Sequence, residues 1–364
     1  MKALLVEKDK IINNLDKIRE KAGGAPIIAV LKANAYGLGL RQMAELLRGE
    51  GVRRLAVTEP HDAVLLRDWG CTEEEILVLR STSCEEDIRE ILTACATATI
   101  GSYDAAVALN GLAEREGASC DVHIKVDTGM GRYGFDPSEL ERILSVYRFM
   151  TNLNVTGMYT HFPLAFKNRK KTLEQCNVLL DVAAKVRQAG LEPGMLHAAN
   201  SAGLFYCNLP GLDAVRPGSS IGGRMTCRGD YGLLKTGKLQ STVAEVRWLS
   251  KGHTIGYGSA YTTRKPTKIA IIPVGTSDGY MVEKARDSFR FSDSLRYAGS
   301  SIKSFLLGKR FYVSISGKRA RVLGHVGVSH TIADVTEIDC AAGDVATFDV
   351  SPIYVPQSIE RRYV

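Results

Sequence analysis

No hydrophobic run in this 364-residue chain approaches the roughly 20 apolar residues that a membrane-spanning helix needs. The opening residues 1–7 are too short and too quickly charged for a signal peptide, so we expect a cytoplasmic protein that does not engage a membrane. The eight cysteines are scattered without paired metal-ligand spacing, which predicts reduced thiols and no metal site. Solenoid-type repeats are also missing.

Basic residues are in excess, giving a net charge of +7, but they form no long run. The denser groups, at 167–171 and 361–362, are brief. This pattern is typical of a solvated surface and argues against nucleic-acid binding, although a basic protein favours anionic cofactors or substrates. The apolar fraction, 45%, is ordinary for a globular protein.

Short apolar runs alternate with helical stretches through residues 8–230. About eight such strand–helix units predict a parallel α/β fold closed into a (β/α)8 TIM-type barrel. Strand-like runs then follow one another without helices, as expected of a mainly antiparallel β domain over 231–364, to which we assign the N-terminal strand 1–7. The polar stretch Tyr280–Gly308 is expected to be a surface excursion.

Lys32 stands where the apolar run Ile27–Leu31 stops. A lysine at the end of a buried strand projects its amine into a low-dielectric mouth, where desolvation lowers the pKa and favours Schiff-base chemistry with an aldehyde cofactor. Gly37 and Gly39 allow a tight turn, and the Tyr36 hydroxyl suits a phosphate. The alternative is a lysine that reaches from the strand end to solvent.

The sequence of this stretch, Val-Leu-Lys-Ala-Asn-Ala-Tyr-Gly-Leu-Gly, closely resembles the cofactor-lysine motif of the alanine racemase family. The family's lysine forms an imine with pyridoxal 5'-phosphate (PLP). The resemblance therefore implies PLP attached to Lys32, with Tyr36 among the cofactor contacts. The family's usual histidine after Tyr-Gly is Leu38 here.

A second segment, Lys125-Val-Asp-Thr-Gly-Met-Gly-Arg132, ends another predicted strand and faces the same side as the cofactor lysine. Arg132 can bind a carboxylate or the cofactor's phenolate oxygen in fork geometry. A structural pair with Asp127 or Asp136 is the alternative. The resemblance implies that Arg132 contacts substrate, and that Lys125 matches a lysine carbamylated in some family members.

Three later segments resemble the family's ring and phosphate contacts, in the family's order. Tyr159-Thr-His161 matches a histidine that links the catalytic tyrosine to an arginine at the cofactor ring. His197-Ala-Ala-Asn-Ser and Arg216-Pro-Gly-Ser-Ser-Ile match the segments around the phosphate. The cofactor contacts implied are His161, Asn200, Ser201, Arg216, Gly218, Ser219 and Ile221, together with Tyr363 in Arg-Arg-Tyr-Val.

Arg216 determines which PLP chemistry fits. Many PLP enzymes place a carboxylate at the pyridine nitrogen to keep it protonated. Arginine cannot accept that proton, because its own pKa is above about 12. The electron sink is then weaker and transamination is suppressed, which suits racemisation.

Tyr257, in Gly-Tyr-Gly-Ser-Ala-Tyr, matches the family's catalytic tyrosine. Inverting an α-carbon needs one base on each face of a planar carbanion, and the resemblance implies Lys32 for one face and Tyr257 for the other. In the family this tyrosine enters the partner's site, so a head-to-tail homodimer is implied. The family's substrate-seating Met-Asp pair is replaced here by Val328 and Ser329.

The resemblance spans nearly the whole chain and implies a PLP-dependent racemase of a small amino acid, alanine by default. Serine or another amino acid is an alternative on the same scaffold, because Val328 and Ser329 depart from the family. A non-catalytic PLP-binding protein is disfavoured by the second domain and Tyr257. A PLP decarboxylase on a related barrel would place an acidic residue where Arg216 stands.

Overall fold

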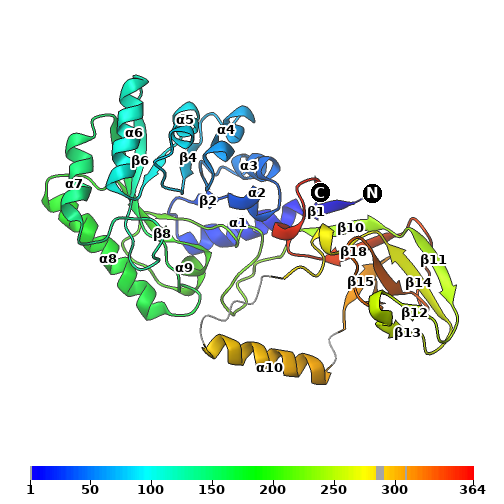
Figure 1. Cartoon of the computed structure of the whole chain (residues 1–364). Coiled ribbons are helices and arrows are strands. Elements are labelled where there is room, and N and C mark those ends of the chain that lie inside the picture. Colours follow the sequence, from blue (N-terminus) through cyan, green and yellow to red (C-terminus); the bar gives the residue numbers. More distant parts are fainter. Residues whose placement is uncertain (1, 284–290, 308–309) are drawn as a thin grey trace. The chain divides into compact units, whose positions relative to one another are not determined.

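The computed structural model describes residues 2–283, 291–307 and 310–364. It divides into two compact units, Glu7–Thr236 and Met1–Val6 with Gly237–Val364 (Figure 1). We call the first the barrel unit and the second the β unit. Within the described residues, no helix combines the length and apolar character needed to cross a membrane.

Two parallel ladders of the barrel unit, β2-β3-β4 and β5-β6-β7-β8-β9, hold its strands. Parallel bridges join Leu77 to Thr97 and Ile27 to Val215, so the ladders close into one ring. This confirms the (β/α)8 barrel expected from the alternation of strands and helices. The strands are β2 (Ile28–Val30), β3 (Arg54–Val57), β4 (Glu75–Val78), β5 (Ala98–Ile100), β6 (Cys120–Lys125), β7 (Leu153–Tyr159), β8 (Met195–Ala199) and β9 (Ala214–Val215).

Helices of the barrel unit surround these strands in Figure 1. Their apolar faces follow helical spacing, as in α3, which buries Leu40, Met43, Ala44 and Leu47 against the barrel. The helices are α1 (Lys8–Ala22), α2 (Lys32–Tyr36), α3 (Leu40–Gly49), α4 (Pro60–Asp68), α5 (Glu85–Thr93), α6 (Tyr103–Arg115), α7 (Leu140–Phe149), α8 (Arg169–Gln188) and α9 (Ser201–Tyr206).

Nine strands of the β unit form one sheet in the order β11-β14-β17-β16-β15-β18-β10-β1-β19. The N-terminal strand β1 pairs antiparallel with β10 and parallel with β19. The strands are β1 (Ala3–Val6), β10 (Lys238–Thr242), β11 (Glu245–Leu249), β14 (Thr267–Ile272), β15 (Tyr312–Ile315), β16 (Lys318–Val322), β17 (Thr331–Asp334), β18 (Val345–Asp349) and β19 (Glu360–Tyr363).

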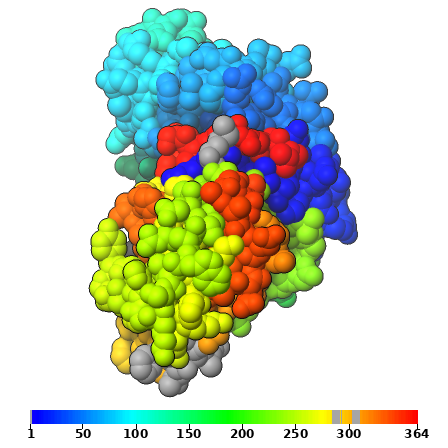
Figure 2. All heavy atoms as spheres, turned by 90° about the vertical axis from the view of Figure 1, so that its right-hand side faces the viewer, coloured from blue at the N-terminus to red at the C-terminus, as the bar shows by residue number. Residues whose placement is uncertain are grey.

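A separate hairpin of the β unit joins β12 (Thr254–Ile255) to β13 (Tyr261–Thr262) through a 3-10 turn at Tyr257–Ser259. Its apolar support comes from Ile255, which packs in a cluster with Leu249 and Leu323. Figure 2 shows the segment that carries β11 and this hairpin, in yellow-green, spread over the face of the β unit that is turned to the viewer.

The excursion expected at Tyr280–Gly308 contains the helix α10 (Phe291–Leu307). Phe291, Leu295 and Ile302 share one side of this helix by their spacing, and all three are exposed. Residues 284–290 and 308 of the expected excursion lie outside the described part of the chain.

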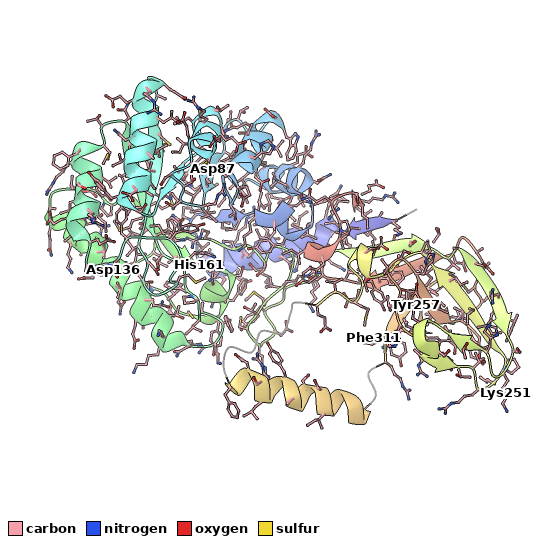
Figure 3. The ribbon with its side chains drawn as sticks, in the orientation of Figure 1. Asp87, Asp136, His161, Lys251, Tyr257 and Phe311 are labelled. Atoms are coloured by element: carbon pink, nitrogen blue, oxygen red, sulfur yellow. The ribbon has the colours of Figure 1, made fainter. Side chains whose placement is uncertain are left out.

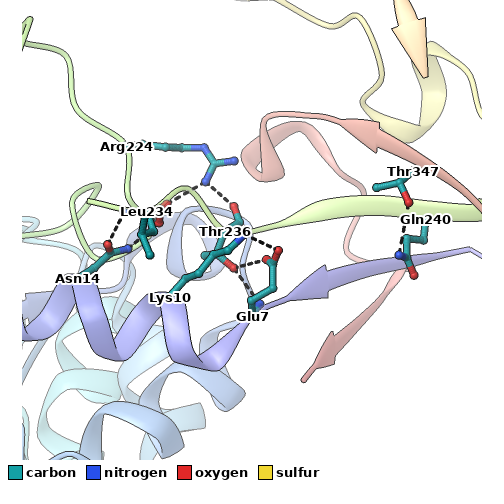
Figure 4. Close-up of polar contacts among 9 residues, drawn as sticks. Glu7, Lys10, Asn14, Arg224, Leu234, Thr236, Gln240 and Thr347 are labelled. Atoms are coloured by element: carbon teal, nitrogen blue, oxygen red, sulfur yellow. Dashed lines mark hydrogen bonds and ion pairs between the residues drawn. The ribbon is translucent and has the colours of Figure 1, made fainter. Parts of the chain in front are cut away.

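Asn14 of α1 ties the barrel unit's last segment to its first helix. Its amide nitrogen donates to the carbonyls of Ile221 (2.9 Å) and Leu234 (2.8 Å), and its oxygen accepts from the Leu234 N–H (2.6 Å). Figure 4 shows this contact beside Glu7, whose carboxylate accepts from the Thr236 hydroxyl at 2.8 Å. Because Asn14 is fully buried, these bonds have no water to replace them.

Replacing Asn14 by Ala should therefore lower the free energy of unfolding by about 2–3 kcal/mol, since three backbone groups lose their partners, one in a buried bond and two in partly buried bonds. Urea denaturation followed by circular dichroism measures this. Asp16→Ala is the control on the same helix, because Asp16 pairs with Arg19 at an exposed site, and it should change stability by no more than about 0.5 kcal/mol. Equal losses in the two variants would contradict the assignment.

Candidate active site

A cavity of about 560 Å³ opens at the carboxyl ends of the barrel strands. This is the end at which barrel enzymes carry their chemistry, because each strand delivers its next residue there. The structure brings ten of the residues singled out from the sequence to this one cavity: Lys32, Tyr36, Lys125, Arg132, His161, Asn200, Ser201, Arg216, Gly218 and Ser219. Ile221 is buried, and its N–H closes a turn on the Gly218 carbonyl at 3.0 Å.

Lys32 follows β2 at the start of a left-handed turn. The φ angles of residues 33–36 lie between 52° and 55°, a conformation that costs about 1–2 kcal/mol for each non-glycine residue. The Asn34 side chain helps to hold it by accepting from the Leu40 N–H at 2.6 Å. Backbone strain of this kind persists where surrounding contacts hold the chain in place. Here the strained turn fixes the position at which Lys32 leaves the strand.

Both lysines that line the cavity have lowered pKa values. Burial, followed by the charges of Arg132 and Arg216, lowers the pKa of Lys32 below its usual range. Burial and the same two arginines lower the pKa of Lys125 to about 8. Each amine therefore has an accessible neutral form, which is the form that attacks a carbonyl carbon.

A cup of small groups lies around Ser201, at the start of α9. The Ser201 hydroxyl oxygen accepts the N–H groups of Gly218 (3.0 Å) and Ser220 (3.2 Å). A Cβ placed on Gly218 would stand 2.3 Å from the Tyr36 hydroxyl, so only glycine fits there. Burial raises the pKa of Tyr36 to about 12, which keeps its hydroxyl protonated and able to donate.

Arg216 lies behind this cup, only 3% exposed. Its guanidinium donates to His197 Nδ1 (2.6 Å) and to the Thr160 carbonyl (2.9 Å), and it stands 4.8 Å from the centre of the Tyr159 ring. A second contact reaches His161 Nδ1 at 3.4 Å. Burial lowers the pKa of Arg216 to about 10, so the group is still a cation at neutral pH.

His161, labelled in Figure 3, is kept neutral. Burial, and then the charges of Arg216 and its neighbours, lowers its pKa to about 3. A neutral imidazole presents one acceptor and one donor nitrogen. Because Nδ1 faces the guanidinium, Nε2 is the nitrogen that carries the proton.

The loop that bears Arg132 is shaped by Asp127 and not by a side-chain ion pair between the two. The Asp127 carboxylate accepts four successive backbone N–H groups, those of residues 129–132. The Asp136 carboxylate accepts from the N–H and hydroxyl of Ser138. Both acids are thus engaged elsewhere, and the Arg132 side chain lines the cavity.

The remaining residues from the sequence analysis belong to the β unit. Tyr257 is 79% exposed on its turn, flanked by Gly256 and Gly258, whose φ angles of 80° and 65° favour glycine (Figure 3). Val328 is 67% exposed, and its carbonyl accepts from the N–H (2.9 Å) and hydroxyl (2.8 Å) of Ser277. Ser329 and Tyr363 lie on the exposed turn before β17 and in β19, respectively.

Sequence reasoning missed His123, on β6. Its Nδ1 lies 2.9 Å from Nε2 of His197, so the two imidazoles and Arg216 form one buried line. The signal was present: His123 stands two residues before Lys125, and alternate residues of a strand share a face. Among the described residues, no cluster of three or more histidine, cysteine or acidic side chains is placed to hold a metal ion.

These residues fit PLP, which offers an aldehyde, a pyridine ring and a phosphate. The amine of Lys32 suits the aldehyde. The buried guanidinium of Arg216 suits a ring nitrogen that stays unprotonated. Tyr36, Ser201 and the backbone at Gly218, where a Cβ would fill the space, suit a phosphate by donor set and size.

Comparisons with known proteins agree with this geometry. The family model for the N-terminal domain of alanine racemases matches residues 6–225, and the model for their C-terminal domain matches residues 236–352. The alanine racemase of Carboxydothermus hydrogenoformans is 32% identical over 342 residues, covering 92% of this chain and 85% of that protein. The alanine racemase of Methanococcus maripaludis is 31% identical over 351 residues, with coverage of 94% and 87%.

Solved structures give the same result. The alanine racemase of Clostridium difficile shares 26% identity and superimposes with a TM-score of 0.86, over 100% of this chain and 95% of that one. The alanine racemase of Bartonella henselae, whose structure holds covalently bound pyridoxal phosphate, shares the fold at 20% identity, with a TM-score of 0.80 over 100% of this chain and 99% of that one.

Replacing Gly218 by Ala should weaken PLP binding about 10–100-fold, because the new methyl group displaces the Tyr36 hydroxyl that helps to shape the phosphate cup. Fluorescence titration of the apoprotein measures the dissociation constant. Gly222→Ala is the control, since its Cβ would have its closest contact, at 3.0 Å, with the end of the Leu38 side chain. Unchanged affinity for PLP in Gly218→Ala would contradict the assignment of the phosphate to this cup.

Proposed function

This chain belongs to the alanine racemase family, and we propose that it interconverts L- and D-alanine with Lys32 and Tyr257 as its two bases. PLP is its cofactor, and racemisation of alanine is the activity that the fold and family support. The observation that carries the proposal is the half-buried Lys32 amine, whose pKa is lowered by burial, in one cavity with the buried Arg216 guanidinium.

When bound, PLP supplies the electron sink that makes the α-proton of an amino acid removable. The residues of the chain do the rest. Lys32 holds or delivers a proton at Nζ on one face of the α-carbon. Tyr257 does the same at its hydroxyl on the other face, so a proton removed from one side is returned from the opposite side.

The other residues of the cavity hold and orient the reacting molecules. Arg216 donates and cannot accept a proton, so it keeps the ring nitrogen unprotonated and disfavours transamination. The exposed Arg132 guanidinium is assigned to the substrate carboxylate. Lys125 is a candidate for carbamylation, because a neutral amine is the form that reacts with carbon dioxide, and its pKa of about 8 makes that form available.

Several assignments rest on the family resemblance together with the fold. They are cofactor contacts by Asn200, Ser219, Ile221 and Tyr363, substrate contacts by Val328 and Ser329, and a head-to-tail homodimer in which Tyr257 serves the partner's cavity. The exposure of Tyr257 on a turn held by two glycines supports the last of these. A cytoplasmic location stays a prediction from the sequence. No observation favours serine over alanine.

Borohydride reduction of the PLP-loaded protein should attach the cofactor to Lys32, and chiral chromatography should detect D-alanine formed from L-alanine. Lys32→Ala should lose the adduct and at least about a hundredfold of the activity, because it removes both the attachment point and one base. Lys185→Ala, on the exposed side of α8, should keep both. A reduced adduct mapped to any other lysine would contradict the assignment.

Mixing inactive Lys32→Ala and Tyr257→Phe subunits should recover activity if Tyr257 acts on the partner's cavity. A mixed dimer then contains one site with both native bases. Full exchange of equal amounts makes about half of the dimers mixed, so activity should approach about one quarter of the native value. Subunit exchange is followed in parallel with two fluorescent labels. Exchange without recovery would place both bases in one subunit.

A further inference from the structure

A line of polar groups crosses the interior of the barrel from the active-site end toward the opposite end. Arg216 contacts His197 Nδ1 at 2.6 Å, and His197 Nε2 contacts His123 Nδ1 at 2.9 Å. His123 Nε2 stands 3.9 Å from Oε1 of Glu75, at the beginning of β4, and the other oxygen of Glu75 accepts from Arg54 at 2.8 Å. His123 and His197 are both buried.

The chemistry of the first group fixes every proton along this line. A guanidinium only donates, so His197 Nδ1 must accept. Its proton is then on Nε2, which donates to Nδ1 of His123. The proton of His123 is consequently on its own Nε2, directed at the Glu75 carboxylate.

The far end favours the same arrangement by a separate contact. A carboxylate 3.9 Å away favours an N–H on His123 Nε2 over a lone pair. The cation at one end and the anion at the other therefore select the same tautomer for both rings. Reversing either ring would set two donors or two acceptors against each other in a site without solvent, which is costly.

The packing prevents the rings from turning to another arrangement. His197 stacks on Tyr159 with ring centres 4.7 Å apart and an interplanar angle of 12°. His123 lies over Gly157, where a Cβ would stand 2.6 Å from Nε2. Burial and the nearby arginines also lower the pKa values of both histidines, to about 4 for His123, which keeps the rings neutral.

We propose that His123 and His197 are positioning residues for Arg216, forming a proton-ordered line that supports the guanidinium from behind and runs toward Glu75 across the barrel. The line leaves the guanidinium no freedom to swing away from the ring nitrogen of the cofactor. This role rests on the proposed function, in which Arg216 meets that nitrogen. The ordering of the protons does not, because it follows from this chain's own contacts.

The proton order is tested first, on protein without cofactor. Long-range ¹H–¹⁵N spectra of histidine-labelled protein distinguish the two neutral tautomers, and the variants His123→Asn and His61→Asn aid assignment among the seven histidines. We expect His123 and His197 to be neutral and to carry the proton on Nε2. A proton on Nδ1 of either ring, or a doubly protonated ring, overturns the proposal.

The positioning role is tested with two substitutions at one site. His123→Leu removes the acceptor for His197, whereas the Oδ1 atom of His123→Asn can replace Nδ1. We expect His123→Leu to lower kcat about 10–100-fold with KM for alanine changed less than about twofold, and His123→Asn to restore most of kcat. His61→Leu, at an exposed site of α4, is the control and should keep both constants.

Equal losses in the leucine and asparagine variants, or a loss confined to KM, would reduce the line to ordinary packing and overturn the proposal. If His123→Leu does not fold, the tautomer measurement on the native chain decides. An absence of racemase activity in the native protein would instead contradict the proposed function. The proton order would then be decided by the histidine spectra alone.

Discussion

The buried cation of Arg216, at the carboxyl end of β9, determines which groups can surround it. Moving a guanidinium out of water costs several kcal/mol unless its donors are paired. Arg216 is supplied with an imidazole, a backbone carbonyl and an aromatic face. The imidazole comes from β8, and the carbonyl and the aromatic face come from the end of the neighbouring β7, so the pairing of these strands and the placement of the charge depend on one another.

The same charge governs the acid–base state of its neighbours. Arg216 and Arg132 help to depress the pKa values of Lys32 and Lys125, so these basic side chains share one cavity at a mutual electrostatic cost. An anionic cofactor and an amino acid carboxylate relieve that repulsion. The cavity is therefore matched to its ligands by charge as well as by shape. Without ligands, the positive charges in the cavity repel one another without compensation.

Much of this was predictable from sequence, for identifiable reasons. The barrel followed from strand–helix alternation, and Lys32 and Arg216 followed from long motifs. The left-handed turn after Lys32 could not be predicted, because alanine and tyrosine do not favour positive φ and only tertiary contacts impose it. His123 gave a signal through alternate-residue spacing, but its partner lies on another strand and becomes visible only after folding.

The helix α10 lies inside the stretch that was expected to be a surface excursion, and no helix was predicted there. Phe291, Leu295 and Ile302 recur at helical spacing among serines and charged residues. The polar composition of the stretch was given more weight than this periodicity, which matches the observed helix.

The first strand of the chain has a consequence for the order of assembly. β1 lies between β10 and β19, so the sheet is completed by segments that precede and follow the entire barrel. During translation β1 stays unpaired until the barrel segment and the strands after it have been synthesised. Pairings between segments so far apart in sequence form slowly. A fragment beginning at Gly237 would leave β10 with an open edge and β19 without the strand that it pairs with, both exposed to strands of other chains. We therefore expect completion of this sheet to be the slowest step of folding and the one most prone to aggregation.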